Sequence, residues 1–148
     1  MTDTNDVLRL DRQLCFMIYA AHHAFTAAYK VGLEPLGLTY PQYLVLLVLW
    51  EQEGLKVKEI GDRLRLDSGT LTPLLKRMET QGSVHRCRDT CDERVVRVSL
   101  AQRGRALQAE AAPIRAKMLC TLEGAHEALA GLQRDLAAIT PLLRSAGD

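Results

Sequence analysis

Cysteine chemistry is the first possibility that this sequence of 148 residues raises. It contains four cysteines, Cys15, Cys87, Cys91 and Cys120. A thiol attacks other molecules mainly as its thiolate, and a phenol O–H that donates a hydrogen bond to sulfur favours that form. Tyrosines follow the first cysteine at Tyr19, Tyr29 and Tyr40. Cys15 is therefore the candidate for a reactive thiol, although a cysteine on an apolar helix is more often a passive packed side chain.

A long helix has to position these side chains. The apolar spacing predicts one helix over residues 8–33, on which Cys15, Tyr19 and Tyr29 lie along one face. Cys15 and Tyr29 are fourteen residues apart, which is about 21 Å along a helix. They cannot meet within one chain, whereas two antiparallel copies of the helix would bring Tyr29 of one subunit level with Cys15 of the other. Tyrosines on this face can therefore donate hydrogen bonds to the Cys15 sulfur mainly in a dimer.

Three further helices follow in the sequence. Thr39 is a typical N-cap with proline in the first turn behind it, and the apolar run that follows predicts a buried helix through Trp50. Two shorter helices are expected at 57–66 and 68–81, the second capped by its preceding aspartate or its first serine. Only a tight turn separates them, which is the spacing of a helix-turn-helix.

A basic hairpin comes next. Residues 84–88 and 94–100 alternate between apolar and polar side chains on either side of a polar connector, which predicts a β-hairpin. The whole chain carries 19 basic and 18 acidic residues, but residues 56–105 hold 12 basic and 7 acidic ones. This uneven distribution is suited to a DNA-reading module between acidic arms, and equally to an ordinary solvated surface.

The predicted fold class is mainly α (α+β), with a winged helix-turn-helix at residues 40–101. Residues 7–34 and 102–146 are expected to be helical arms that form an intertwined dimerisation region, because each arm is too apolar on one side to stand alone. The chain 1–148 is then one unit, and the expected partners are a second copy of the chain and double-stranded DNA.

The second helix of the helix-turn-helix is the predicted recognition helix. Ser68, Thr70 and Thr72 lie near its N-terminus and offer short donors and acceptors to base edges and phosphates. Lys76 and Arg77 can neutralise backbone phosphates, and Arg88 of the hairpin is counted with them. The apolar side chains of this helix are expected to face the core, namely Leu71, Leu74, Leu75 and Met78.

The hairpin gives a specific resemblance. The segment Asp92–Leu100, followed by Gln-Arg-Gly at 102–104, resembles the wing of the MarR family, and the similarity extends over nearly the whole chain. In that family the wing arginine enters the minor groove and the aspartate two residues before it holds it in place. The resemblance assigns these roles to Arg94 and Asp92. A family dimer reads a palindrome, with one recognition helix in each major-groove half-site.

A second resemblance concerns the cysteines. The sequence is similar to the organic hydroperoxide resistance regulators, a branch of the MarR family, at Leu14-Cys15-Phe16, Tyr19, Tyr29, Tyr40 and the run 66–77. It implies a repressor in which Cys15 senses organic hydroperoxides and partner-chain tyrosines hold it. Cys120 lies where some members have a resolving cysteine, which implies an intersubunit disulfide with Cys15 and release of DNA.

Two other functions compete with this one. A MarR-type repressor released by a small aromatic ligand, with Cys15 merely buried, is the alternative. A thiol peroxidase is disfavoured because no thioredoxin-like βαβ pattern occurs, and we expect no enzyme, cofactor or metal. Cys87 and Cys91, near His85, match no strong zinc pattern and are expected to be incidental exposed thiols. Neither a secretory signal nor a membrane span is expected, so the cytoplasm is the expected location.

Overall fold

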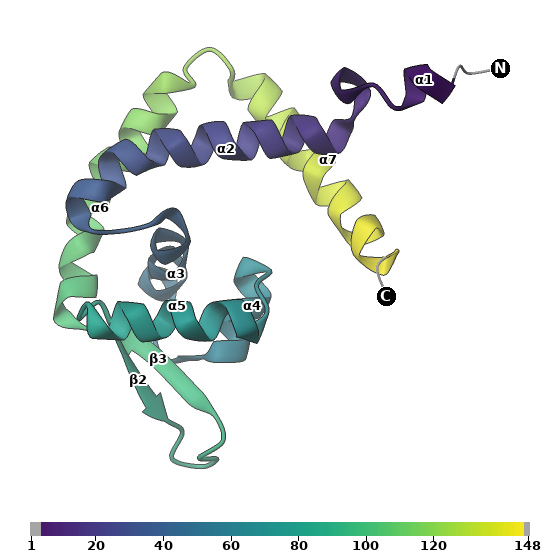
Figure 1. Cartoon of the computed structure of the whole chain (residues 1–148). Coiled ribbons are helices and arrows are strands. Elements are labelled where there is room, and N and C mark those ends of the chain that lie inside the picture. Colours follow the sequence, from purple (N-terminus) through teal and green to yellow (C-terminus); the bar gives the residue numbers. More distant parts are fainter. Residues whose placement is uncertain (1–3, 147–148) are drawn as a thin grey trace. The chain divides into compact units, whose positions relative to one another are not determined.

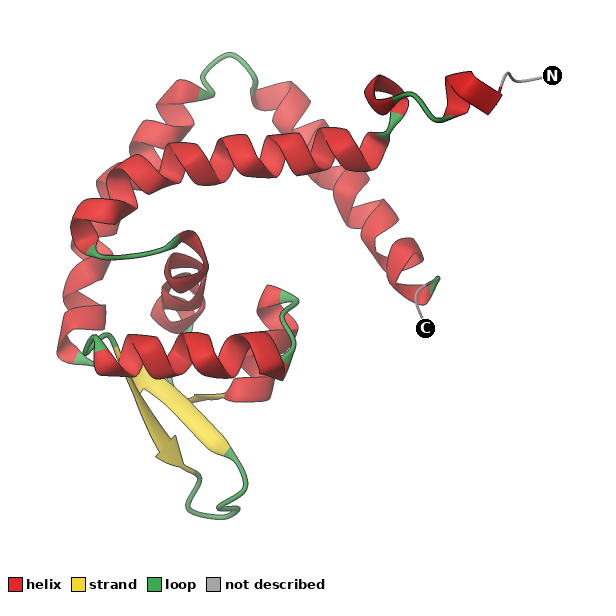
Figure 2. Cartoon of the chain, viewed as in Figure 1, coloured by secondary structure: helices red, strands yellow, loops and turns green. Residues whose placement is uncertain are grey.

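The computed structural model of the chain describes residues 4–146 (Figures 1 and 2). Its helices are α1 (Thr4–Val7), α2 (Leu14–Leu33), α3 (Tyr40–Glu51), α4 (Val57–Leu64), α5 (Ser68–Thr80), α6 (Gln102–Thr121) and α7 (His126–Ser145). Its strands are β1 (Leu55–Lys56), β2 (Val84–Arg88) and β3 (Val96–Leu100), and two 3-10 turns, η1 (Leu10–Arg12) and η2 (Glu34–Leu36), flank α2. The predicted fold class, mainly α with a small sheet, is confirmed.

Two compact units make up the chain, Met1–Ile114 and Arg115–Asp148. The first contains the helix-turn-helix and the sheet. The second contains the C-terminal part of α6 and α7, joined by a turn in which Gly124 has φ +90°, a conformation that glycine adopts without strain. Among the helices of residues 4–146, none is long and apolar enough to cross a membrane.

Helix α2 begins later than its apolar pattern predicts, at Leu14 rather than near residue 8. Gln13 is extended, with φ −86° and ψ 109°, and its side-chain amide donates to the carbonyls of Val7 (2.7 Å) and Arg9 (3.0 Å). A side chain that bonds nearby carbonyls in this way competes with the helical hydrogen bonds. Cys15 therefore lies in the first turn of α2.

Helix α3 starts as predicted. The Thr39 hydroxyl accepts from the Gln42 N–H (3.5 Å), and the Gln42 side chain accepts from the Thr39 N–H (2.9 Å), which makes a capping box. The Gln42 amide also donates to the Gln81 side chain (3.1 Å), just beyond the end of α5. This buried glutamine thus ties the start of α3 to the end of the recognition helix.

The helix-turn-helix is built from α4 and α5. Arg65 ends α4 in the left-handed region (φ 60°), and Asp67, one of the two predicted caps, accepts from the Thr70 N–H (2.9 Å). The side chains predicted to face inward from α5 are all buried, namely Leu71, Leu74, Leu75 and Met78. Their spacing over two turns gives α5 one apolar face, which leaves the opposite face to solvent.

The sheet has three antiparallel strands in the order β1-β3-β2. The predicted hairpin pairs Val84 with Leu100 and Arg88 with Val96, and Val98 of the central strand is fully buried. The sequence analysis missed β1, which pairs Leu55 with Val98. Two residues are too few to show alternation, so only the presence of β3 defines this strand.

Gly104 at the start of α6 approaches the base of the hairpin so closely that a Cβ atom there would lie 2.1 Å from the Ser83 carbonyl oxygen. We predict that Gly104→Ala lowers the free energy of unfolding by about 3 kcal/mol, the cost of overpacking against backbone. Urea unfolding at a fixed protein concentration measures this change in the free energy of unfolding.

Gly131→Ala is the matched control, because in α7 nothing lies nearer to such a Cβ than an Arg134 side-chain atom at 3.9 Å. Alanine is favoured over glycine in a helix, so this control should be neutral or stabilising. Equal stability of Gly104→Ala and the unmodified protein would contradict the close packing of α6 on Ser83.

Candidate functional site

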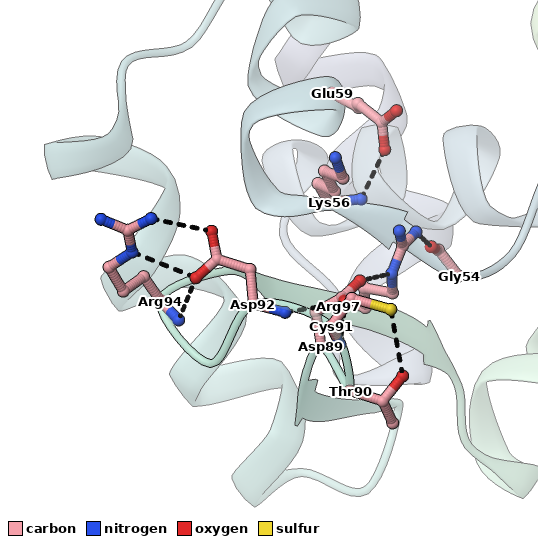
Figure 3. A network of polar contacts seen from close by, with 9 residues as sticks. All are labelled: Gly54, Lys56, Glu59, Asp89, Thr90, Cys91, Asp92, Arg94 and Arg97. Carbon is pink, nitrogen blue, oxygen red and sulfur yellow. Dashed lines mark hydrogen bonds and ion pairs between the residues drawn. The ribbon is translucent and has the colours of Figure 1, made fainter.

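The wing tip presents one arginine to solvent. Asp92 and Arg94 lie in the loop between β2 and β3, and Arg94 Nε donates to Asp92 Oδ1 (3.1 Å) while Nη2 donates to Oδ2 (3.3 Å) (Figure 3). The Arg94 backbone N–H donates to Oδ1 as well (3.1 Å). The Arg94 side chain is 91% exposed, so Asp92 is what holds its guanidinium. These bonds hold the pKa of Asp92 below its ordinary value, the Arg94 side chain contributing most.

A second acid–arginine pair lies behind the tip. Asp89 accepts from the backbone N–H groups of Cys91 (2.8 Å) and Asp92 (3.3 Å), and from Arg97 Nε (Figure 3). The other arm of Arg97 donates to the Gly54 carbonyl (2.8 Å). The pKa of Asp89 lies below its usual range, first because of the Cys91 N–H and then because of Arg97. The sequence analysis missed this pair.

The predicted DNA-reading side chains of α5 lie mostly in solvent. Ser68, Thr70, Lys76 and Arg77 are exposed, and Thr72 is half-buried. The Thr70 hydroxyl donates to the N-capping carboxylate (2.9 Å), so it is left as an acceptor. The hydrogen bonds from Thr70 hold the pKa of that carboxyl, Asp67, below its ordinary value, the backbone N–H being the largest cause.

An open hollow of about 640 Å³ connects the helix-turn-helix with the wing. Its lining includes Ser68 from the start of α5 and Arg94 from the wing, both of which are predicted DNA-binding residues. It also includes Lys56 and Lys58, which had been counted only within the basic segment. Their placement beside Arg94 follows from the folding of β1 and α4 against the hairpin, for which the sequence carries no local signal.

Cys15 is an exposed thiol near the N-terminal end of α2. Tyr19, one turn further on, is 60% exposed and contacts the His23 ring edge-on, with ring centroids 4.3 Å apart. The Phe16 ring also stacks on Tyr19, with ring centroids 6.5 Å apart. This end of α2 is therefore an apolar, largely solvent-facing surface that carries the thiol.

The remaining predicted tyrosines lie at the other end of α2. Tyr29 is buried, and its ring centroid is 5.1 Å from that of Tyr40 and 5.6 Å from that of Tyr43. Tyr43, which the sequence analysis did not single out, contacts Trp50 at 6.2 Å. The Trp50 indole N–H then donates to the Gly104 carbonyl (2.9 Å). Tyr29 and Tyr40 thus meet each other in one chain, apart from Cys15 and Tyr19.

The other three cysteines are also exposed and free of disulfides. Cys120 lies near the end of α6 in the second unit, and Cys87 lies on β2. Cys91 lies in the wing loop, with Sγ 4.0 Å from the Thr90 hydroxyl. Within residues 4–146 no group of three or more His, Cys, Asp or Glu side chains could hold a metal ion.

The wing-tip pair gives a prediction about pH. Replacing Arg94 with alanine removes the main cause of the lowered Asp92 pKa, so this pKa should rise toward about 3.9, the ordinary value. Because the pKa is depressed, the pair contributes stability above that ordinary value and loses it as the pH falls through the folded-state value. The ¹³C shift of the Asp92 carboxyl, followed against pH, measures the change.

Arg88→Ala is the control for this titration, because the Arg88 guanidinium donates to the Glu93 carbonyl (3.4 Å) and not to Asp92. It should leave the Asp92 titration where it is. An Asp92 carboxyl that titrates at the same pH with and without the Arg94 side chain would rule out the bidentate contact in solution.

Several known proteins are similar to this chain over most of its length. Residues 27–111 match the family described as Transcriptional regulator SarA/Rot. The HTH-type transcriptional regulator TtmR of Methylorubrum extorquens (strain PA1) is 63% identical over 107 residues, which are 72% of this chain and 55% of TtmR. The chain thus spans about half the length of that relative. The organic hydroperoxide resistance transcriptional regulator of Bacillus subtilis (strain 168) is 50% identical over 119 residues, which are 80% of this chain and 81% of that protein.

Several solved structures are also similar to this chain. The crystal structure of AbfR of Staphylococcus epidermidis has a TM-score of 0.75 and 32% identity, covering 95% of this chain and 97% of that chain. Other similar structures describe AbfR reduced and bound to DNA, overoxidised and bound to DNA, and with a disulfide formed, with TM-scores of 0.74, 0.73 and 0.63. TtmR and the Bacillus subtilis protein are both named as transcriptional regulators. The chain belongs to the MarR family of winged helix-turn-helix transcriptional regulators, in the branch of the organic hydroperoxide resistance regulators.

Proposed function

We propose that the chain is a cytoplasmic transcriptional repressor that binds palindromic operator DNA as a homodimer and releases it when organic hydroperoxides oxidise Cys15. The observation that carries the proposal is the division of the predicted sensing residues between the two ends of α2. Cys15 and Tyr19 lie exposed at one end, and Tyr29 and Tyr40 lie together at the other. A second antiparallel copy of α2 would join the two sets into one site.

The reading elements support the DNA-binding part. Exposed hydroxyls and basic side chains of α5, together with Arg94 of the wing, line the solvent side of the winged helix-turn-helix. In a dimer, each α5 would enter one major-groove half-site while each wing reaches the flanking minor groove. AbfR, which is similar to this chain over nearly its whole length, has been solved bound to DNA in its reduced form. The arms 7–34 and 102–146 would form the dimerisation region.

The position of Cys15 supports the oxidation part. The first turn of a helix lies at the positive end of the helix dipole, which favours a nearby anion such as a thiolate. The side chain is open to solvent in the single chain, so a peroxide can reach it. Phenol groups of Tyr29 and Tyr40 from the partner subunit would donate to the sulfur from the side that one chain leaves open.

The chemistry needs two steps. The Cys15 thiolate attacks the outer oxygen of the hydroperoxide, the O–O bond breaks, and the thiol becomes a sulfenic acid while the hydroperoxide is reduced to an alcohol. Cys120 of the partner subunit then attacks the sulfenic sulfur, forming an intersubunit disulfide and releasing water. A disulfide requires Cα atoms within about 6 Å, so closing it would move the arms that set the spacing of the two α5 helices.

Oxidation should release DNA only through Cys15. We predict that cumene hydroperoxide weakens binding of the reduced protein to its best duplex, selected from a random library, by about a thousandfold, the usual gap between specific and non-specific binding. Cys15→Ser should keep full affinity under the same treatment. Fluorescence anisotropy at constant salt measures both.

Cys87→Ser is the matched control, since it removes another exposed thiol of the chain, and it should respond to peroxide as the unmodified protein does. DNA release by the Cys15→Ser variant on peroxide addition would refute the sensing role of Cys15. If a small aromatic acid released DNA from the Cys15→Ser variant instead, the alternative function would be favoured, namely a MarR-type repressor released by a small aromatic ligand. For that alternative, a hollow of about 500 Å³ lined by residues that include Thr26, Lys30 and Tyr40 is large enough for such a ligand.

The resolving role of Cys120 has its own test. Peroxide-treated protein should run as a crosslinked dimer on a non-reducing gel, and Cys120→Ser should run as a monomer. Mass spectrometry of that variant should find Cys15 as a sulfenic acid or its further oxidation products. Crosslinking that persists in Cys120→Ser and disappears in Cys91→Ser would assign the resolving role to the wing thiol instead.

A further inference from the structure

We infer that Asp89 and Arg97 are positioning residues for DNA binding: they fix the wing loop in the conformation from which Asp92 presents Arg94. The inference rests on the proposed DNA-binding function and adds two residues that act through Arg94. Neither of them needs to touch DNA. Figure 3 shows the contacts in series, from Gly54 through Arg97, Asp89 and Asp92 to Arg94.

Arg97 anchors the series to the sheet. It lies on β3, the central strand, where it pairs with Lys56 of β1 on one side and Cys87 of β2 on the other. Its guanidinium donates through Nη1 to the Gly54 carbonyl (2.8 Å) and through Nε to Asp89. A strand that is paired on both sides has little freedom to move, so the planar fork of Arg97 is a fixed point for the loop.

Asp89 is the first residue of the wing loop, and its side chain organises that loop. Its side chain is only 11% exposed, and its carboxylate takes the N–H groups of Cys91 and Asp92 along with Arg97. The Asp89 N–H donates to the Val95 carbonyl (2.8 Å), and the Val95 N–H donates to the Asp92 carbonyl (2.9 Å). The carboxylate therefore sets the backbone of Asp92 directly, and the loop closes on itself around it.

Among residues 4–146, Asp92 is the one partner whose hydrogen bonds hold the Arg94 side chain, so Arg94 depends on this arrangement. Its side chain is almost fully exposed, and the hydrogen bonds that orient it all end on Asp92. An arginine held in its binding conformation before DNA arrives loses less side-chain entropy on binding. If the Asp92 backbone moves, Arg94 keeps its charge, but its guanidinium is no longer held in one orientation.

The structure separates this role from simple support of the fold. The core beneath the hairpin consists of apolar side chains, Val84, Val98 and Leu100, which neither Asp89 nor Arg97 replaces. The Arg97 side chain is 44% exposed, and the Asp89 side chain, although only 11% exposed, bonds Arg97 and the backbone of its own loop rather than the apolar core. Loss of the pair is thus expected to loosen the loop while the sheet remains.

A double-mutant cycle tests the inference. Asp89→Asn keeps the shape of the side chain but removes its charge, and it should weaken binding to the selected duplex by about three- to tenfold, the cost of ordering one long side chain. Arg94→Ala should weaken binding as well. The double variant should bind no more weakly than Arg94→Ala alone, because Asp89 acts only through Arg94.

Glu79→Gln is the matched control. Glu79 of α5 accepts from Arg86 of β2 through Nε (2.9 Å) and Nη2 (2.8 Å), so this pair resembles Asp89–Arg97 but lies outside the wing loop. Any effect of Glu79→Gln on binding should multiply with that of Arg94→Ala. In the protein without DNA, amide hydrogen exchange at Cys91 and Asp92 should speed up in Asp89→Asn and remain unchanged in Glu79→Gln.

Two outcomes would overturn the inference alone: normal binding by Asp89→Asn, or an equal loss from Asp89→Asn with and without the Arg94 side chain. Normal binding by Arg94→Ala would overturn it together with the proposed role of the wing. Arg97→Lys provides the same cycle if Asp89→Asn does not fold. It keeps the positive charge but has no fork to join Gly54 and Asp89, so it should again weaken binding only while Arg94 is present.

Discussion

The reach of α2 is the constraint on which the proposed switch depends. Tyr29 and Leu33 at its C-terminal end are buried, and the Tyr29 ring contacts Tyr43 of α3. Cys15 at its N-terminal end is exposed. Because a helix is stiff and rises about 1.5 Å per residue, no change of rotamer brings these ends together. Each chain therefore has two incomplete sets of the proposed sensing residues, and in the proposed switch dimerisation would be part of the chemistry as well as of DNA recognition.

Helix α3 is in contact with both the tyrosines and the reading elements. At its start, Tyr40 contacts Tyr29, and the capping residue Gln42 bonds Gln81 beyond the end of α5. At its end, Trp50 donates to Gly104, which packs against the base of the hairpin. The two hydrogen bonds are direct and partly buried. A displacement of the tyrosines would thus meet a helix that is already bonded to Gln81, just beyond the end of α5, and to Gly104 in α6.

The acidic residues of the reading module have a geometric role. A DNA-binding surface would be expected to avoid carboxylates, yet Asp67, Asp89 and Asp92 all belong to the start of α5 or the wing loop, which we propose to bind DNA. Each of them accepts hydrogen bonds from backbone N–H groups and from a hydroxyl or a guanidinium, and each has a pKa below its ordinary value. Their charge is used to shape a helix start and a loop, so the exposed cations can face DNA. The nearly neutral net charge of the chain is compatible with a DNA reader for this reason.

Local patterns in the amino-acid sequence predict the elements that depend on neighbouring residues. The N-cap Thr39, the apolar face of α5 and the alternation of the hairpin were predicted, and the cap of α5 was narrowed to Asp67 or Ser68, because each of these signals depends on residues a few positions apart. The tertiary structure decided the features that join distant segments: the two-residue strand β1, the contact of Arg97 with Gly54 across 43 positions, and the place of Tyr43 among the tyrosines. It also set the start of α2 at Leu14, where the Gln13 side chain takes up carbonyls of the preceding turn. Periodicity reports which face of an element is apolar, whereas these contacts depend on which elements meet, and only packing fixes that.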